Sequence, residues 1–261
     1  MSATPSGRRT RNASPARRRL AFMGGEIGIW VALYGVYLAV RGLTIGGREE
    51  AIANARGVIG LEHSLGVFRE MDVQSALEPL RGALSAYYMA GFAPVIAATL
   101  VVLAVRDRTA YRELRTALLV SIAIATVVFV AFPAAPPRLV PELGILDTVG
   151  LTGHDNGSFA GIRFNPYAAV PSMHVGRSLL VGIAGYRAAR TRWVKALFAA
   201  HPAVMVLTVT ATGNHYFFDA ATGTVVALAG LLITRRGRTL VSAIIKSRRK
   251  TAGVGEPVPV G

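Results

Sequence analysis

Two histidines and an aspartate stand out in the apolar second half of the chain. His215 and Asp219 lie four residues apart in TGNHYFFDAATG, and His174 follows a proline and a serine in AVPSMHVGR. Residues four apart on a helix share one face, so we expect Asp219 to contact the His215 imidazole. A carboxylate beside an imidazole commonly orients a catalytic histidine. A polar pair at a membrane surface is the alternative interpretation.

Arginines near these residues favour phosphate chemistry. Arg138 follows the prolines of FPAAPPRL, and Arg177 lies one helical turn after His174. A helix that begins near Pro171 exposes N–H groups around Ser172 that bind anions, and arginines bind phosphate oxygens through paired hydrogen bonds. One histidine can then attack phosphorus while the other protonates the departing oxygen. The non-catalytic alternatives are an interfacial Arg138 and an Arg177 paired with a carboxylate.

A zinc site formed by His174, His215 and Asp219 is the competing chemistry. The arginines nearby disfavour a dication, and the absence of cysteine excludes thiolate ligands and disulfides. Phosphoryl transfer by two histidines requires no metal and no other cofactor, so we expect neither. His201, which precedes Pro202 inside an apolar run, is expected to be a packed, hydrogen-bonded histidine instead.

Long apolar segments must position these residues. The 261 residues are 52% hydrophobic yet carry a net charge of +15, so apolar and basic residues are segregated along the chain. Since about 20 apolar residues cross a bilayer, the sequence predicts an all-α integral membrane bundle of about six transmembrane helices. The apolar runs are 20–40, 82–105, 116–137, 178–186, 196–214 and 220–234. We expect a catalytic membrane domain at 20–246, with a disordered basic tail at 1–19 and another disordered tail at 247–261.

The basic residues predict the orientation of the bundle. They cluster in the N-terminal tail and at 106–115, 187–195 and 235–250, which fall on one side if there are six helices. The positive-inside rule then predicts a multi-pass plasma-membrane protein with cytoplasmic termini and an extracytoplasmic site. The charge suits anionic headgroups of the bilayer, and we expect no nucleic-acid partner. Residues 46–81 alternate charged and apolar positions, which predicts an interfacial amphipathic helix or pair of helices.

PSMH and, further along the chain, HYFFD resemble the second and third signatures of the type 2 phosphatidic acid phosphatase superfamily, P-S-G-H and S-R-x5-H-x3-D. The resemblance covers about 111–234, together with the plan of six helices. It implies that His215 is a nucleophile that forms a phosphohistidine and that Asp219 orients it. It also implies that His174 is the acid for the leaving group and later the base for the acceptor. Ser172 and the N–H groups beside it would hold phosphate.

The chain departs from the superfamily pattern at two places. Ala131 and Leu139 stand where the first signature, K-x6-R-P, has its lysine and its proline, and Thr208–Val209 stand where the third signature has Ser-Arg. The usual phosphate-binding lysine and second arginine are therefore absent from their places. We expect Arg138, together with Arg177 or Arg163, to compensate.

FPAAPPRL, NPYAAVPSMH and NHYFFD are similar to the branch that includes the inositol phosphorylceramide synthases of the aureobasidin-resistance type. These relatives transfer a phospho-headgroup between lipids, so the acceptor is either water or an alcohol such as inositol. Candidate residues of the substrate or acceptor pocket are Asn165, Tyr167 and Tyr216, with Asp155 and Asn156. The expected function is a lipid phosphatase or phosphotransferase that acts on a lipid phosphate substrate. A non-enzymatic protein that binds anionic lipid is the alternative, and a transporter is weaker because no inverted repeat is seen.

Overall fold

The structure of the chain is a computed structural model. It describes residues 47–148, 158–159, 162–163 and 165–251, together with 14, 17, 24–29, 31–32 and 35. The chain divides into two units, Met1–Thr44 and Ile45–Gly261. Residues 24–29 of the first unit are helical, and the rest of the tail and of the expected first span lies mostly outside the described residues. All of the site residues belong to the second unit.

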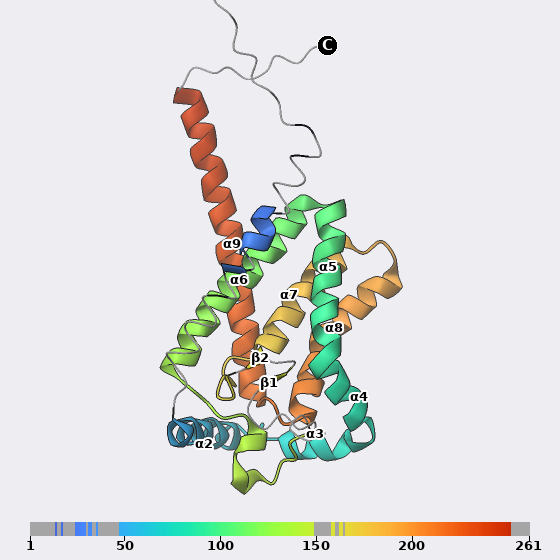
Figure 1. The fold of residues 1–261 in the computed structure, drawn as a ribbon, viewed down its shortest axis with the longest axis vertical. Coiled ribbons are helices and arrows are strands. Elements are labelled where there is room, and N and C mark those ends of the chain that lie inside the picture. Colours follow the sequence, from blue (N-terminus) through green and yellow to red (C-terminus); the bar gives the residue numbers. More distant parts are fainter. Residues whose placement is uncertain are drawn as a thin grey trace, which may run out of the picture. The chain divides into compact units, whose positions relative to one another are not determined.

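The second unit is built from helices (Figure 1). In chain order they are α2 (Arg48–Ser64), α3 (Glu70–Ala76), η1 (Glu78–Leu80), α4 (Arg81–Ala86), η2 (Tyr87–Gly91), α5 (Phe92–Arg106), α6 (Arg108–Ala131), η3 (Pro137–Leu139), η4 (Pro141–Leu143), α7 (Met173–Ala188), α8 (Arg192–Ala211) and α9 (Phe217–Thr251). A short antiparallel pair, β1 (Ser158–Phe159) and β2 (Ile162–Arg163), lies between η4 and α7. The all-α expectation is confirmed apart from this pair.

Four helices are long and apolar enough to cross a membrane: Glu78–Arg106, Arg108–Ala131, Arg192–Ala211 and Phe217–Ile245. They account for four of the six expected spans. The helix expected around 178–186 is α7, whose 16 residues extend about 24 Å and fall short of a hydrocarbon core of about 30 Å. The first expected span lies mostly outside the described residues. At the other end α9 remains helical to Thr251, beyond the expected start of the C-terminal tail at 247.

Small residues allow the helices to pack closely. A Cβ atom at Gly230 of α9 would overlap the Ser121 hydroxyl of α6, and one at Gly185 of α7 would overlap the Phe198 ring of α8. Ser121 satisfies its hydroxyl within α6 by donating to the Ala117 carbonyl at 2.7 Å. Such contacts between small residues are the usual means of helix association in a bilayer, where apolar burial alone supplies little driving force.

The expected helical pair at 46–81 is present as α2 and α3. Both lie across the end of the bundle at which α9 begins (Figure 1). Asn54 of α2 donates a side-chain hydrogen bond to the Pro133 carbonyl at 2.8 Å, and Gln74 of α3 donates one to the Ala211 carbonyl at 3.1 Å. These hydrogen bonds connect α2 to the chain that follows α6 and α3 to the end of α8.

The opposite end of the bundle gathers basic side chains around one carboxylate. Glu113, near the start of α6, forms ion pairs with Arg187 of α7 and with Arg235 and Arg238 of α9, at 3.5, 2.8 and 3.1 Å. The start of α6, the end of α7 and the middle of α9 therefore meet at this end. The sequence placed these arginines on one side, and the ion pairs confirm that they lie together.

Candidate active site

The start of α7 positions His174. Ser172 is the N-cap residue, and its hydroxyl accepts a hydrogen bond from the Val175 N–H at 3.4 Å. The helix begins at Met173, two residues after the expected start near Pro171, so Pro171 precedes the cap. His174 lies in the first turn and Arg177 one turn further along.

The start of α9 positions His215 and Asp219. The helix begins at Phe217, so His215 and Tyr216 precede it instead of opening it as expected. The Asp219 Oδ2 atom accepts hydrogen bonds from the Tyr216 N–H at 3.0 Å and from the His215 Nδ1 at 3.2 Å. The carboxylate thus caps its own helix in the manner of a capping box and contacts the imidazole at the same time. The expected contact between His215 and Asp219 is confirmed.

A close crossing brings these two helix starts together. The Ser172 N–H donates a hydrogen bond to the Asp219 carbonyl at 2.9 Å. A Cβ atom at Gly223 of α9 would overlap the Ser172 carbonyl, and one at Gly176 of α7 would lie 2.7 Å from the Gly223 carbonyl oxygen. Only glycines permit this approach. As a result the ring centroids of His174 and His215 are 5.8 Å apart.

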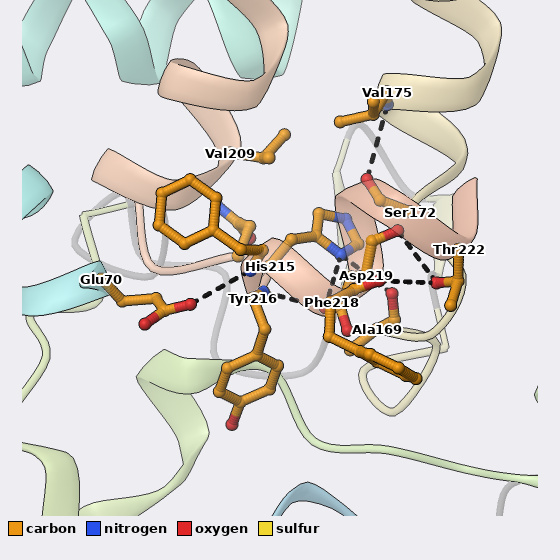
Figure 2. Close-up of polar contacts among 12 residues, drawn as sticks. Glu70, Ala169, Ser172, Val175, Val209, His215, Tyr216, Phe218, Asp219 and Thr222 are labelled. Carbon is orange, nitrogen blue, oxygen red and sulfur yellow. Dashed lines mark hydrogen bonds and ion pairs between the residues drawn. The ribbon is translucent and has the colours of Figure 1, made fainter. Parts of the chain in front are cut away.

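The hydrogen bonds of His215 define its tautomer. Its Nδ1 atom lies 2.9 Å from the Ala169 carbonyl oxygen and 3.2 Å from the Asp219 Oδ2 (Figure 2). A carbonyl can only accept, so Nδ1 carries the hydrogen and Nε2 of the neutral ring has a lone pair. The residue is 5% exposed, so neighbouring groups and not bulk water determine its orientation.

Aromatic rings from the π-helical turn η2 and the start of α5 surround His174. Its ring centroid lies 4.4 Å from that of Tyr88 and 5.0 Å from that of Phe92. The contact between the two rings places Tyr88 beside His174. Tyr88 was not among the residues expected in the site. The signal in the sequence was the pair of tyrosines in an apolar run. A π-helical turn often occurs at a functional site, but it leaves no period in the sequence.

The same turn confirms the expectation for His201. The Tyr87 hydroxyl lies 3.0 Å from the His201 Nδ1 atom, so this histidine of α8 is packed and hydrogen-bonded within the bundle. A Cβ atom at Gly91 would overlap the Tyr87 ring, which explains the glycine at the end of the turn.

Arg138 is tied to the turn that precedes His215. Its backbone N–H donates to the Gly213 carbonyl at 3.0 Å, its Nη1 donates to the Asn214 side-chain oxygen at 2.7 Å, and its Nε lies 3.3 Å from an Asp147 carboxylate oxygen. Gly213 has a φ of 68°, a left-handed conformation that favours glycine. Arg138 is therefore hydrogen-bonded to the two residues that directly precede His215 in the chain. Asn214 and Asp147, which hold it, were not anticipated.

Three residues expected in the substrate or acceptor pocket have described surroundings. Asn165 accepts a hydrogen bond from the Tyr167 N–H at 2.9 Å, and this stretch leads to Ala169, which holds His215. Tyr216 is fully buried in a cluster with α2 residues, and its ring points away from the His215 ring (Figure 2). Its hydroxyl has no hydrogen-bond partner among the described residues. Tyr216 thus contributes packing at this position.

Three further candidates are left without a described side chain. The backbone of Arg163 lies in β2, but its side chain is outside the description, and so are Asp155 and Asn156. Ser172 is placed beside Asp219, but its N–H is already used by the Asp219 carbonyl. An anion at the start of α7 would therefore meet the N–H groups that follow Ser172.

The zinc alternative has no matching arrangement. Within the described parts of the chain, no group of three histidine, aspartate or glutamate side chains could hold a metal ion. The Asp219 Oδ2 atom instead accepts hydrogen bonds from His215 and from the Tyr216 N–H.

Gly223→Ala tests whether the crossing of α7 and α9 aligns the histidines. The added methyl group would force the start of α7 away from α9, which we expect to lower both the activity and the melting temperature, with a loss of stability of about 1–3 kcal/mol. Gly237→Ala on the same helix is the matched control, because no atom lies near its Cβ position. Wild-type activity and melting temperature in Gly223→Ala would show that the close crossing does not hold the site.

One comparison with known proteins identifies a family. Residues 56–233 match the family model described as PAP2 superfamily, a range that runs from α2 into α9 and includes both histidines, Asp219 and Arg138. No curated protein and no solved structure gives a significant match. Because the family match covers more than half of the 261 residues, the chain belongs to the PAP2 superfamily.

Proposed function

We propose that this membrane protein is a lipid phosphatase or phosphotransferase that forms a phosphohistidine at His215. The observation that carries the proposal is the pair of imidazoles 5.8 Å apart, with Nδ1 of His215 held by a carbonyl and a carboxylate. An attacking atom approaches within about 3–3.5 Å, and a proton donor within about 2.6–3.2 Å of the departing oxygen. The two rings are close enough together for both to reach groups of one bound phosphate.

The reaction proceeds in two steps. In the first, the Nε2 lone pair of His215 forms a bond to phosphorus, the bond from phosphorus to the lipid oxygen breaks, and His174 gives a proton to that oxygen. Burial, and then His215 and Arg177, lower the pKa of His174 well below its ordinary value, so the negative charge of the bound phosphate must keep this ring protonated. Asp219 stabilises the positive charge that develops on the His215 ring. In the second, His174 takes a proton from water or an alcohol, whose oxygen attacks phosphorus and releases His215. Proton transfers of this kind contribute about 10²–10⁴-fold to the rate.

The phosphate oxygens would be held by Arg138, Arg177 and the N–H groups at the start of α7. The Tyr88 hydroxyl, whose ring lies 4.4 Å from the His174 ring, would donate a further hydrogen bond. This set replaces the lysine and arginine that the superfamily signatures place elsewhere. Arg163 stays a candidate for the same role.

The surroundings of the site support the proposed substrate and the proposed membrane face. Membership of the superfamily suggests a lipid phosphate, and four apolar helices suggest a membrane protein. The arginines around Glu113 lie at the end of the bundle opposite the starts of α7 and α9, so the positive-inside rule favours an extracytoplasmic site and cytoplasmic termini in a plasma membrane. Asn165 and Tyr167, near Ala169, suit an alcohol acceptor such as inositol, as in the inositol phosphorylceramide synthase branch.

The direct test uses the purified protein in detergent with a panel of lipid phosphates and phosphatidylinositol-type donors. We expect turnover of at least one of them and a covalent phosphoenzyme that is labile in acid and stable in alkali, as phosphohistidine is. Release of inorganic phosphate that no alcohol alters would identify a phosphatase, and transfer to an added alcohol would identify a phosphotransferase. Binding of anionic lipids without any turnover would favour the non-enzymatic alternative.

Asp219→Asn is expected to lower the rate of phosphoenzyme formation by about 10–10³-fold, less than loss of either histidine. The amide can still accept the Tyr216 N–H, and the Ala169 carbonyl still fixes the His215 tautomer. Only the charge that stabilises the developing imidazolium is lost. Single-turnover kinetics measure this step. A loss as large as that of His215→Ala would mean that Asp219 does more than orient the ring and stabilise its charge.

A further inference from the structure

Two glutamates outside the proposed chemistry are buried beside the active site. Glu62 near the end of α2 is 1% exposed and Glu70 at the start of α3 is 0% exposed. Carboxylates are almost never fully buried unless hydrogen bonds or charges compensate for the lost hydration. Their burial therefore requires partners.

The partners are the first N–H groups of α9. Glu70 Oε1 accepts from the Phe217 N–H at 3.0 Å, and Glu62 Oε1 accepts from the Phe218 N–H at 2.5 Å. Asp219 accepts from the Tyr216 N–H, so three successive N–H groups each have a different carboxylate as acceptor. Figure 2 shows Glu70 reaching the start of α9 from α3. The positive end of the helix dipole favours negative charge at this place.

Three carboxylates in so small a volume cannot all be charged without cost. Burial has the largest effect on the pKa of Glu62, and the neighbouring Glu70 adds to it, so that the pKa rises to about 8. The hydrogen bond from the Phe218 N–H acts in the opposite direction. Asp219 also acts on Glu62, and the remaining ionisable neighbours at the start of α9 are His215 and Tyr216. Glu62 Oε2 is buried and has no hydrogen-bond partner among the described residues, which makes it the place for the proton.

We propose that Glu62 and Glu70 are positioning residues of the active site, which dock the start of α9 on α2 and α3 and thereby fix His215, and that loss of the Glu62 proton loosens this docking. The catalytic consequence rests on the proposed function of His215, whereas the docking does not. Tyr216, at the position of the helix cap, has its side chain buried elsewhere and supplies no capping oxygen. Asp219 caps only the Tyr216 N–H, so the acceptors for the Phe217 and Phe218 N–H groups come from the two helices across the end of the bundle. A displacement of about 1 Å at a reacting group can cost about 10²-fold in rate.

The proposal fixes the direction of the pH dependence. A carboxyl whose pKa is higher in the folded protein than the 4.5 of an unperturbed glutamate favours the folded state at low pH. This stabilisation is complete below about pH 4.5 and is lost as the pH rises through about 8. Docking of α9, and with it the activity, should therefore decline on the alkaline side of neutrality.

Glu62→Gln separates the effect of the titrating Glu62 proton from the effect of the side chain as a hydrogen-bond acceptor. A glutamine oxygen can still accept the Phe218 N–H, and its uncharged amide imitates the protonated acid. At pH 7 we expect kcat and KM within about threefold of wild type, and no alkaline decline near pH 8. Glu62→Ala should lower kcat about 10–100-fold with little change in KM, because the reacting groups are misaligned while the lipid still binds. Glu50→Gln on α2 and Asp72→Asn on α3 remove exposed carboxylates and are the matched controls.

Hydrogen–deuterium exchange tests the docking without relying on catalysis. In the full-length protein in detergent, protection of the amides of 216–218 should fall above about pH 8 in wild type relative to Glu62→Gln measured at the same pH. Equal protection in the two proteins from pH 6 to 9, or an unchanged alkaline limb of activity in Glu62→Gln, would overturn the proposal. If wild type shows no turnover at all, the proposed function fails, and the exchange data alone still judge the docking.

Discussion

Replacing His215 with alanine is expected to lower turnover of a lipid phosphate by at least about 10³-fold and to abolish the acid-labile phosphoenzyme. The Nε2 atom of His215 is the proposed nucleophile, and water attacking directly would lack the position and orientation that the ring has. Its neighbours cannot replace it, because Asp219 is directed at Nδ1 and the start of α9. The measurements are steady-state turnover and trapping of labelled phosphoenzyme after a rapid quench.

The matched control is His63→Ala. His63 is exposed on α2, where its ring stacks on Phe68 with centroids 4.3 Å apart, and it has no place in the proposed reaction. We expect its replacement to leave turnover and labelling unchanged. Labelling that survives in His215→Ala, with the variant folded as judged by its melting temperature, would assign the covalent intermediate to another residue or remove it from the mechanism.

The sequence predicts those parts of the fold that follow a simple physical rule. Uncharged runs of sufficient length predict spanning helices, and α6, α8 and α9 agree with that rule. The helix α7 is shorter than this rule requires, since it begins only after Ser172 and ends before Ala189. The rule also gives no account of the π-helical turn at Tyr87–Gly91, which depends on packing between distant helices and leaves no period in the sequence.

The same distinction holds at the active site. The spacing of His215 and Asp219 is local, so their contact could be predicted, and so could the placement of His174 in a first turn. The partners of Glu62 and Glu70 lie 156 and 147 residues away, at Phe218 and Phe217. Their charges in an amphipathic stretch predict a solvated surface, and only the tertiary arrangement reveals that they are buried. Asn214 and Tyr88 likewise acquire their roles from neighbours that no sequence spacing specifies.

His174→Ala is expected to have an effect that depends on the leaving group. With a lipid phosphate, the departing alkoxide needs a proton, so we expect the rate of phosphoenzyme formation to fall by about 10²–10⁴-fold. An aryl phosphate with an acidic phenol as its leaving group needs no proton, so its first step should remain within about tenfold of wild type. The second step still requires His174 as the base. The variant should therefore release one burst of phenolate and accumulate the phosphoenzyme, which rapid-quench labelling and stopped-flow absorbance can follow together.

This dependence separates catalysis from packing. The His174 ring lies near the rings of Tyr88, Phe92 and His215, so alanine also removes contacts that align the site. A purely structural loss would slow the lipid and the aryl phosphate by the same factor and would leave no burst. His174→Gln, which fills more of the space but cannot transfer the proton in the same way, should reproduce the leaving-group dependence of alanine. Equal losses for both substrates in both variants would assign the acid role to another group, with the Tyr88 hydroxyl as the nearest alternative.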